Sequence, residues 1–484
     1  MNNVSTYCRL AVLGSLLLSG CITVGPDYQT PKLPLPEQWT PPSVQVGAVN
    51  VELAHWWQGF SDPQLNTLIA SALAQNLDIQ ATKARLRNAR AAIQSVEARF
   101  WPEVAAASVY QRQRISPNSL QGVLGSATSG GGPNGPGLGP LGTPFDIFRA
   151  GFDSNWELDL FGGIQRQQQA AMALAEAALE SQRDVQVSLT SEVAQLYFSW
   201  LSLQQQESIL HHQQEQLTIL QHLGEVAYAE GLVTLLEKQE ADLLLQNLRS
   251  KFPALQIKIA TAQHQLEYLC GLKTDALAKR LRAASQLPAA PQVPLGLPAE
   301  LLRRRPDIRL AERKLAAASE LLGVAIAEQF PKLALTGNVG LQSQELSNFA
   351  NMTSGFYGFG PRISLPVFQM GRIASNITAH RAQLEEAQTL YEKSVTLALR
   401  EVADALSSLT QLQKKRETLQ AATQTAERSA TLAIAMFNEG ESDLKPVLQN
   451  HLNWDDLRSQ QIANELDWIK SNLALYKALG GGWQ

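Results

Sequence analysis

Hydrophobic residues follow two different periods along this chain, and each period predicts a different kind of element. Between residues 65 and 99, apolar side chains recur every three or four positions, as in an amphipathic helix that ends before Pro102. Between 148 and 160 the period is two, because Phe, Trp and Leu alternate with Arg, Asp and Glu, as in a strand with one apolar and one polar face. The same alternation recurs at 332–342 and, more weakly, at 104–112 and 359–368.

Two unusually long helical patterns follow the paired strands. Residues 165–227 contain no proline and a single interior glycine, and residues 373–437 match them. A continuous helix of this length would extend ~95 Å at about 1.5 Å per residue. With Leu and Ala on one side and Gln on the other, such helices must pack side by side, and a purely structural coiled coil is one way to do so. Returning helices are expected over 233–270 and 444–479, interrupted at Pro253 and Pro446.

An internal repeat organises most of the chain. Residues 76–102 align without a gap with residues 305–331, at a separation of 229. Further along, 229–245 pairs with 438–454 at a separation of 209, which places Gly231 opposite Gly440. The two halves are therefore one supersecondary unit used twice.

The repeat also sets the expected domain boundaries. The first half must contain 20 extra residues, which we place in the Gly-, Pro- and Ser-rich segment 116–142, an exposed loop by composition. We expect a signal peptide, an extended segment, two repeats joined by a linker, and a short C-terminal tail. These segments are 1–20, 21–63, 64–271, 272–297, 298–480 and 481–484.

The N-terminus has the layout of an export signal. Arg9 precedes the apolar run 10–18, which is too short to cross a bilayer as a permanent helix. The run ends in Leu-Ser-Gly-Cys, which resembles the lipobox of bacterial lipoproteins, so we predict acylation of Cys21 and its use as a membrane anchor. An ordinary signal peptide cleaved nearby is the alternative. Cys8 would leave with the signal and Cys270 has no partner, so no disulfide is expected.

Composition and charge argue against several function classes. The 40 basic and 44 acidic residues nearly balance, so the chain has no field that would attract nucleic acid. The seven histidines show no metal-ligand spacing with carboxylates, and no nucleophile-elbow or phosphate-loop motif is present. We therefore expect no catalytic residue, no metal and no cofactor other than covalent lipid, and we do not expect an enzyme.

The alternating segments raise the question of a membrane. They are about 9 to 13 residues long, enough to cross a bilayer as tilted strands, although a soluble sandwich would produce the same alternation. Four strands cannot close a barrel, because the smallest membrane barrels need ~8. An open edge in lipid would leave backbone groups unpaired at several kcal/mol each. A membrane barrel must therefore be shared between two copies or three, with Asp153, Asn155, Glu157 and Asp159 facing a water-filled lumen.

Four stretches between residue 21 and the C-terminus resemble the TolC-like outer membrane factors, specifically the NodT-like lipoprotein branch that serves resistance-nodulation-division efflux pumps. The resemblance implies a mainly α fold with membrane β structure. As a homotrimer it would form a 12-stranded outer membrane β-barrel continuous with a long 12-helix periplasmic α-barrel. The stretches are "CITVGPDYQTP", "WWQGFSDPQLNTLIASALAQNLDIQATKARLRNAR", "WELDLFGGIQRQ" and "RRRPDIRLAERKLAAASELLGVAIAEQFPKLALTGNVG".

The resemblance implies passive conduction of drugs or other toxic compounds out of the cell. Its implied partners are an inner membrane pump of the resistance-nodulation-division type, a periplasmic adaptor and outer membrane lipid. A duct for type I protein secretion and a non-porous periplasmic scaffold lipoprotein are the alternatives. Ile22 follows the predicted lipidated cysteine, whereas the inner membrane retention signal resembles an aspartate there, so we expect delivery to the Gram-negative outer membrane.

The resemblance also implies where the two ends of the helix pairs act. Gly231 and Gly440 fall where adaptor hairpins dock, and both also suit helix C-caps. Family members commonly place a leucine five residues and an aspartate nine residues after the second glycine, as constricting rings. Here these positions hold Lys445 and Gln449, and Asp443 lies close by, so these three residues are the gate candidates.

Overall fold

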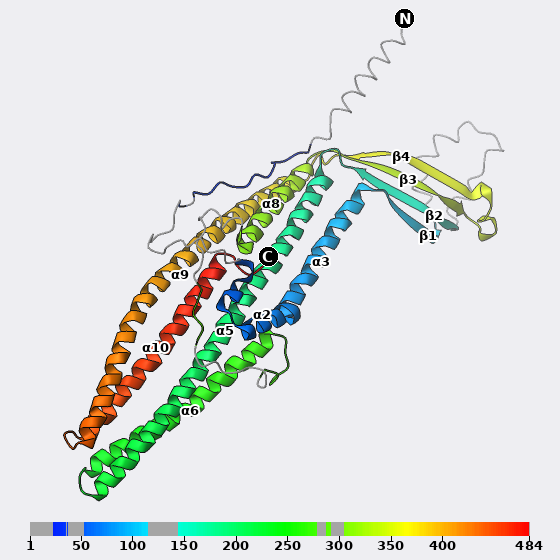
Figure 1. Ribbon diagram of the computed structural model, residues 1–484. Coiled ribbons are helices and arrows are strands. Elements are labelled where there is room, and N and C mark those ends of the chain that lie inside the picture. Colours follow the sequence, from blue (N-terminus) through cyan, green and yellow to red (C-terminus); the bar gives the residue numbers. More distant parts are fainter. Residues whose placement is uncertain are drawn as a thin grey trace, which may run out of the picture. The chain divides into compact units, whose positions relative to one another are not determined.

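The computed structural model describes residues 23–34, 36, 53–114, 144–277, 287–291 and 304–483 (Figure 1). The chain divides into two compact units, each assembled from segments that are distant in sequence. None of the helices in these described ranges has the length and apolar character needed to cross a membrane. The described residues of the first unit come from Met1–Gln29, Ala89–Leu174 and Ala316–Glu386, and those of the second from Thr30–Asn88, Ala175–Leu315 and Ala387–Gln484.

The first unit contains a four-stranded antiparallel sheet in the order β1-β2-β3-β4. The strand expected over 359–368 is shifted, because Ser364 lies opposite Lys332, the first residue of β3, and the chain beyond has no backbone partner in the sheet. Asp159, expected on a strand, lies past the end of β2, and its carboxylate accepts a hydrogen bond from the Gln165 N–H at 2.7 Å. The strands are β1 (Glu103–Gln113), β2 (Phe145–Leu158), β3 (Lys332–Ser343) and β4 (Gly355–Ser364).

The sheet has one apolar and one mostly polar face. Because side chains alternate along each strand, the pairing register determines which residues share a face. The apolar face includes Val104, Tyr110, Phe148, Phe152, Trp156, Leu335, Val339, Tyr357 and Phe359. The opposite face includes Gln111, Arg149, Asp153, Asn155, Glu157, Thr336, Asn338 and Gln342.

Helices make up most of the described chain, and the two halves use equal lengths. Helices α5 (Gly163–Ala229) and α9 (Arg372–Asn438) each have 67 residues. Their returning partners α6 (Leu235–Leu269) and α10 (Leu444–Ala478) each have 35. The remaining helical elements are η1 (Leu53–Phe60), α2 (Pro63–Gln75), α3 (Leu77–Glu97), η2 (Ala98–Phe100), α8 (Pro306–Ala327), η5 (Leu346–Asn348) and η6 (Met352–Ser354).

Three helix boundaries differ from the sequence expectation. The single helix expected over 65–99 is broken at Asn76, whose side-chain oxygen accepts from the N–H groups of the next helix's first turn and so caps α3. Helix α6 continues through Pro253 without interruption. Pro446 is the third residue of α10, where a backbone N–H would have no partner within the helix, so it does not interrupt that helix either.

The internal repeat is visible in the strand pairing. Glu103, the first residue of β1, lies opposite Asn155 of β2, and Lys332, the first residue of β3, lies opposite Ser364 of β4. Lys332 follows Glu103 by 229 residues, whereas Ser364 follows Asn155 by only 209. The 20 extra residues must therefore lie between β1 and β2. Segment 116–142, where we expect them, falls outside the described residues.

Equivalent positions also make equivalent contacts with different chemistry. The Asn76 side-chain amide donates to the Leu269 carbonyl at 3.0 Å, and Arg305, at the matching position, donates to the Ala478 carbonyl at 3.0 Å. Arg305 also binds the carboxylates of Asp307 and Glu401. Each half thus ties the start of its first helix to the end of its returning helix.

The aromatic core of the second unit joins the N-terminal segment to the long helices. Trp56 is almost completely buried and stacks on Tyr476 of α10 at a centroid distance of 5.3 Å. The Tyr197 hydroxyl of α5 donates to the carboxylate of Asp62 at 2.8 Å. Cys270 is a free, buried thiol at the end of α6, and burial raises its pKa to about 11.

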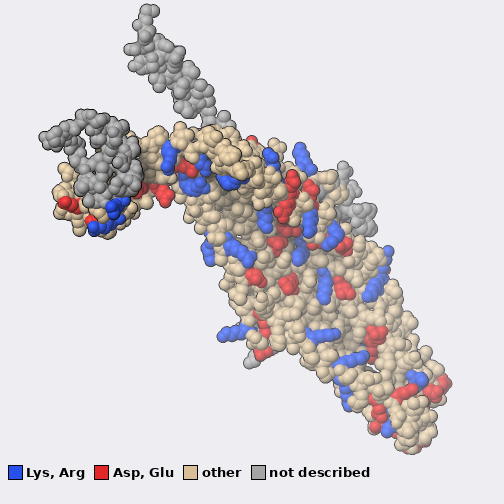
Figure 2. All heavy atoms as spheres, turned by 180° about the vertical axis from the view of Figure 1, so that it is seen from behind, with Lys and Arg blue, Asp and Glu red and all other residues tan. Residues whose placement is uncertain are grey.

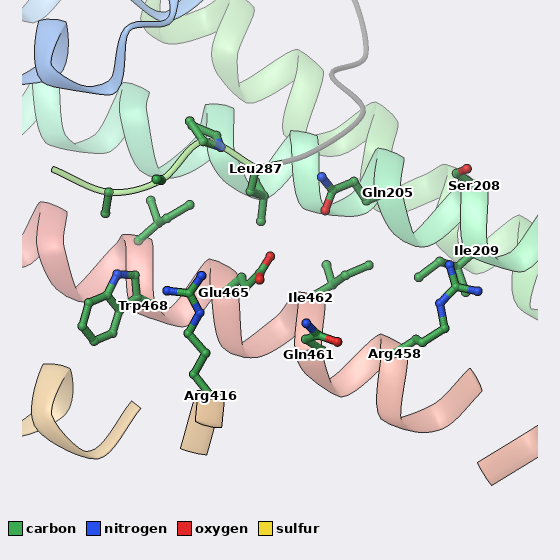
Figure 3. Close-up of a pocket in the computed structure, with 14 residues that line it drawn as sticks. Gln205, Ser208, Ile209, Leu287, Arg416, Arg458, Gln461, Ile462, Glu465 and Trp468 are labelled. Atoms are coloured by element: carbon green, nitrogen blue, oxygen red, sulfur yellow. The ribbon is translucent and has the colours of Figure 1, made fainter. Parts of the chain in front are cut away.

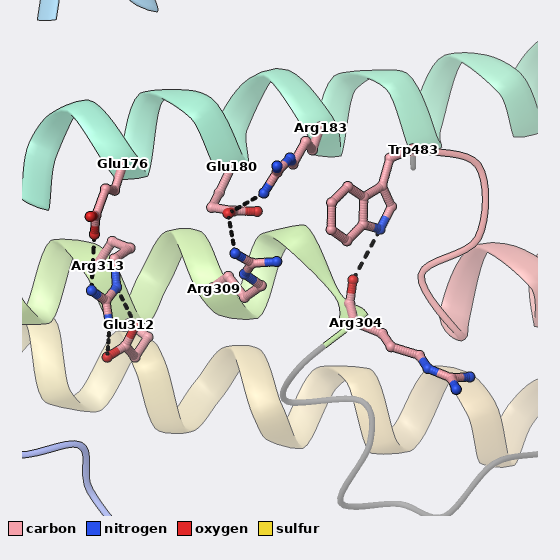
Figure 4. A network of polar contacts seen from close by, with 8 residues as sticks. All are labelled: Glu176, Glu180, Arg183, Arg304, Arg309, Glu312, Arg313 and Trp483. Atoms are coloured by element: carbon pink, nitrogen blue, oxygen red, sulfur yellow. Dashed lines mark hydrogen bonds and ion pairs between the residues drawn. The ribbon is translucent and has the colours of Figure 1, made fainter. Parts of the chain in front are cut away.

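A polar network holds α8 against α5 (Figure 4). Glu180 binds both Arg183 and Arg309 at 2.7 Å, and Arg313 binds Glu176 at 2.9 Å. The indole of Trp483 packs on the guanidinium groups of Arg183 and Arg309, and its N–H donates to the Arg304 carbonyl at 3.0 Å. The C-terminal segment thereby fixes the beginning of the second repeat.

Candidate functional site at the two helix turns

The two glycines predicted at the helix turns have the backbone conformation that the sequence suggested. Gly231 has φ +73° and Gly440 has φ +75°, and a Cβ at either position would meet nothing within 4 Å. Glycine is therefore required by the left-handed backbone and not by lack of space. Two backbone hydrogen bonds close each turn. In the first turn, the N–H groups of Gly231 and Leu232 donate to the carbonyls of Tyr228 and Ala227, respectively. In the second turn, the N–H groups of Gly440 and Glu441 donate to the carbonyls of Phe437 and Met436.

The two turns differ in how the next helix begins. Thr234 caps α6 through a capping box with Glu237, and hydrogen bonds from the backbone and hydroxyl of Thr234 lower the pKa of that carboxyl. Asp443 occupies the equivalent position before α10, but its side chain makes no capping hydrogen bond. The Asp443 carboxylate is exposed, so it is available to a group outside this turn.

Lys445 and Gln449 lie one helical turn apart on α10, and both are exposed. The Lys445 ammonium lies 3.8 Å from the Glu240 carboxylate of α6 and so links the two helix pairs electrostatically. Lys445 and Gln449 therefore share the exposed side of the first turns of α10, and the third gate candidate, Asp443, is exposed just before the helix begins. Leu444, Val447 and Leu448 form the buried side.

Sequence reasoning did not identify the apolar contact beneath these residues. Leu444 is 0% exposed, and a Cβ on Gly224 of α5 would lie 3.2 Å from its side chain. Gly224, the interior glycine noted in this long helix, thus permits the close approach of α10; its isolation in the pattern was the available signal. We call the whole contact the tip cluster: Leu217, Leu220, Ala241, Leu245, Leu248, Ala433, Leu444, Val447 and Leu448.

Titratable groups follow the tip cluster along α10. Burial raises the pKa of the Asp455 carboxyl to about 6, against the opposing effect of the Arg458 charge. Burial, together with the charge of His212, lowers the pKa of His451, whose Nε2 has no hydrogen-bond partner among the described residues. This part of the helix interface disfavours buried charge.

A hollow of about 820 Å³ lies beside α10 in the second unit (Figure 3). Arg416, Arg458 and Glu465 line it together with Trp468 and the segment at Leu287. Within the described residues, no three His, Cys, Asp or Glu side chains come together in a way that would hold a metal ion. The face shown in Figure 2 carries acidic and basic side chains interspersed along the helices, which agrees with the balanced charge.

The predicted anchor, Cys21, lies outside the described residues, but the chain just after it is held firmly. The Val24 N–H donates to the Phe161 carbonyl at 3.2 Å. Arg166, whose side chain is buried, binds the carboxylates of Asp27 and Glu320 at 2.8 Å each. The segment that follows Cys21 is thus fixed at the start of α5, near the end of β2.

Comparison with protein families gives a match over both halves of the chain. The model of the outer membrane efflux protein family matches residues 68–272 and 297–481. The chain belongs to this family. The outer membrane efflux protein described here is therefore an outer membrane component of an efflux system, and the predicted family, fold class and location are confirmed. The family is one of transport ducts.

Curated relatives of this efflux protein match it over almost their whole length. The toluene efflux pump outer membrane protein TtgI of Pseudomonas putida is 30% identical over 99% of this chain and 98% of its own. The pyoverdine export outer membrane protein OpmQ of Pseudomonas aeruginosa is 29% identical over 97% of this chain and 96% of its own.

Solved structures share the fold of the efflux protein. The outer-membrane channel OprN is 30% identical, with a TM-score of 0.84 over 95% of this chain and 99% of its own. CusC is 25% identical, with a TM-score of 0.82 over 95% of this chain and 100% of its own.

Proposed function

We propose that this efflux protein is the passive exit duct of a tripartite pump, through which small toxic organic compounds leave the cell. The relatives named for toluene, solvent and antibiotic efflux support this substrate class. An inner membrane transporter of the resistance-nodulation-division type would supply the energy, and a periplasmic adaptor would join it to the duct.

The two-faced sheet is the observation that carries the proposal. Its apolar face suits lipid and its polar face suits a water-filled lumen, yet β1 and β4 are both left with an unpaired edge in a single copy. In lipid, each unpaired backbone group would cost several kcal/mol. A homotrimer would supply twelve strands and remove every edge, and its long helices would continue the duct as an α-barrel.

We assign the turns at Gly231 and Gly440 to adaptor docking, and the first turns of α10 to the gate. The exposed Asp443, Lys445 and Gln449 would form rings around the axis of the trimer, while the tip cluster beneath them would hold the closed position. The ion pair between Lys445 and Glu240 supports this assignment, since it links α10 to the neighbouring helix pair.

We further propose that Cys21 carries covalent lipid. Val24 and Asp27 are held at the start of α5, near the end of β2, and this supports an anchor close to that end of the sheet. Replacement of Cys21 by Ser should abolish incorporation of labelled palmitate while leaving the folded protein intact. Equal labelling of both proteins would contradict the assignment.

Two measurements on the same protein test the proposed duct. Deletion of the gene should increase susceptibility to solvents and hydrophobic antibiotics, and the wild-type gene should restore resistance. The purified protein, added to planar lipid bilayers, should produce discrete conductance steps. Unchanged susceptibility together with electrically silent bilayers would refute the duct.

A further inference from the structure

The hollow beside α10 is a part of the molecule that the proposed duct does not use. Side chains of α5, α9 and α10 and the segment 287–290 line it, and all of them belong to the second unit (Figure 3). Its volume of about 820 Å³ lies within the range of small-molecule sites, about 300–1,000 Å³. None of the residues assigned to the gate, the docking turns or the anchor lines it.

Helix α10 presents one continuous side to the hollow. Arg458, Glu465 and Trp468 are among its lining residues, and all of those on α10 follow one another at helical spacing. Along the helix axis, Glu465 lies ~10 Å beyond Arg458 and ~4.5 Å before Trp468, at about 1.5 Å per residue. The hollow is therefore long enough to contact a ligand with separate charged and apolar groups.

One of the three charged side chains of the hollow already has partners. The Arg458 guanidinium lies over the Trp454 ring, 5.2 Å from its centroid, and its charge acts on the neighbouring Asp455 carboxyl by lowering the pKa of that group against the effect of burial. Arg416 and Glu465 differ from it, because neither makes an ion pair or hydrogen bond with any residue that the structure describes. The charges left for a ligand are thus one cation and one anion.

These two charges come from different helices and enter the same hollow. Figure 3 shows Arg416 reaching from α9 toward the part of α10 that carries Glu465 and Trp468. A simple anion bound to Arg416 would be repelled by Glu465, and a simple cation bound to Glu465 would be repelled by Arg416. A ligand that carries both a carboxylate and an ammonium group avoids both repulsions and gives each side chain a partner.

The remaining lining residues indicate what joins the two charged groups. The Gln205 and Gln461 side-chain amides have no partner among the described residues, and each can donate to and accept from a peptide group. Trp468, Ile462 and Leu287 supply apolar surface beside them. An indole ring favours an aromatic or aliphatic side chain as its neighbour.

We propose that the hollow binds a short peptide with free ends and an apolar side chain. The carboxylate would contact Arg416, the ammonium group would contact Glu465, and the apolar side chain would pack on Trp468. The proposal goes beyond the duct and does not depend on it. Since α5 belongs to the first repeat and α9 and α10 to the second, the bound peptide would contact both repeats and stabilise the folded protein.

Isothermal titration calorimetry of the purified full-length protein tests the site, with the dipeptide alanyl-phenylalanine as the probe. Its two ends carry opposite charges at neutral pH. Titration up to about 10 mM would fill ~90% of a site with a Kd of about 1 mM. We expect saturable binding of the dipeptide, and binding at least about tenfold weaker for its N-acetyl and methyl ester derivatives, each of which lacks one charge.

Variants matched to these derivatives assign each charge to its side chain. Arg416→Gln should weaken binding of the dipeptide at least about tenfold but should not weaken binding of the methyl ester, which has no carboxylate. Glu465→Gln should weaken binding of the dipeptide to a similar extent but should not weaken binding of the N-acetyl derivative, which has no ammonium group. A general disturbance of the hollow would weaken all three ligands together and would contradict the assignment.

Exposed charges on the same helices provide the controls. Arg428→Gln on α9 and Asp467→Asn on α10 remove one charge each outside the hollow and should leave the Kd of the dipeptide unchanged. The proposal is overturned if the wild-type protein shows no saturable binding of the dipeptide. It is equally overturned if Arg416→Gln and Glu465→Gln bind the dipeptide as tightly as the two control variants do.

Discussion

Truncation of Leu444 to Ala tests whether the tip cluster holds the start of α10 in place. The Leu444 side chain is fully buried, and it packs where Gly224 allows α5 to approach closely. The change leaves a cavity in this contact and alters none of the three exposed gate candidates. We therefore expect the mutation to weaken the packing of α10 without changing the charge at the tip.

The size of the effect follows from the burial. Replacing a fully buried Leu with Ala costs about 2–5 kcal/mol, depending on how far the surroundings collapse into the cavity. The tip cluster contains only nine buried residues and lies near the exposed turns, so we expect about 3 kcal/mol. If half of this cost, about 1.5 kcal/mol, falls on the closed tip and not on the open one, the equilibrium between the two shifts and the open population rises roughly tenfold.

Single-channel conductance in planar bilayers is the direct assay. Leu444→Ala should spend more time in high-conductance states than the wild type. The control is Leu432→Ala, which removes the same atoms from a 61% exposed position on α9 and should behave like the wild type. If Leu444→Ala lowers thermal stability but leaves the conductance distribution equal to that of the control, the tip cluster contributes stability only and the gating argument fails.

Four further substitutions have defined outcomes. Gly440→Ala should cost about 1–2 kcal/mol from backbone strain alone, whereas Gly271→Ala should cost more because its Cβ would lie 2.8 Å from a backbone oxygen; thermal unfolding compares them. The raised pKa of Asp455, about 6, means that the folded state holds a proton that the unfolded state releases near pH 4. Stability from this group is therefore present below pH 4 and lost as pH rises to about 6, and Asp455→Asn should remove that dependence. Arg166→Met should cost about 3–5 kcal/mol by leaving Glu320 buried without its cation, and proteolysis should then release the N-terminal segment.

Matched variants show whether these effects have the stated causes. Asp456→Asn changes the neighbouring, exposed carboxylate and should leave the pH 4–6 dependence intact. Arg372→Met removes an exposed cation near Glu328 and should cost under about 1 kcal/mol. Equal destabilisation by Arg166→Met and Arg372→Met, or equal cost of Ala at Gly271 and Gly440, would contradict the corresponding argument.

Periodicity predicted the long helices and the alternating strands well because each signal extends over many residues. It missed the break at Asn76, since the apolar spacing continues across it and only the capping side chain, buried against Leu269, stops the helix. Pro253 and Pro446 were wrongly expected to interrupt helices. Proline identity alone does not tell whether the lost hydrogen bond falls in the first turn or is offset by packing along a long helix.

The candidate site was less predictable than the fold. Gly231 and Gly440 could be located from the repeat, because a left-handed turn demands glycine at both positions. The pairing of Lys445 with Glu240 and the contact of Leu444 with Gly224 join residues on different helices. Such contacts depend on how the helices rotate about their axes, which no local pattern specifies.

The distribution of change between the two halves follows from the geometry of their elements. Helices α5 and α9 have kept equal lengths, as have α6 and α10, whereas all 20 extra residues fall between β1 and β2. One inserted residue in a helix rotates everything beyond it by about 100° and advances it by about 1.5 Å. Such a change would turn the tip cluster out of its contact, while a connection at the end of a hairpin absorbs any length without moving either strand. The two repeats therefore keep the lengths of the helices whose ends must meet at the tip, whereas the connection between β1 and β2 is free to differ in length.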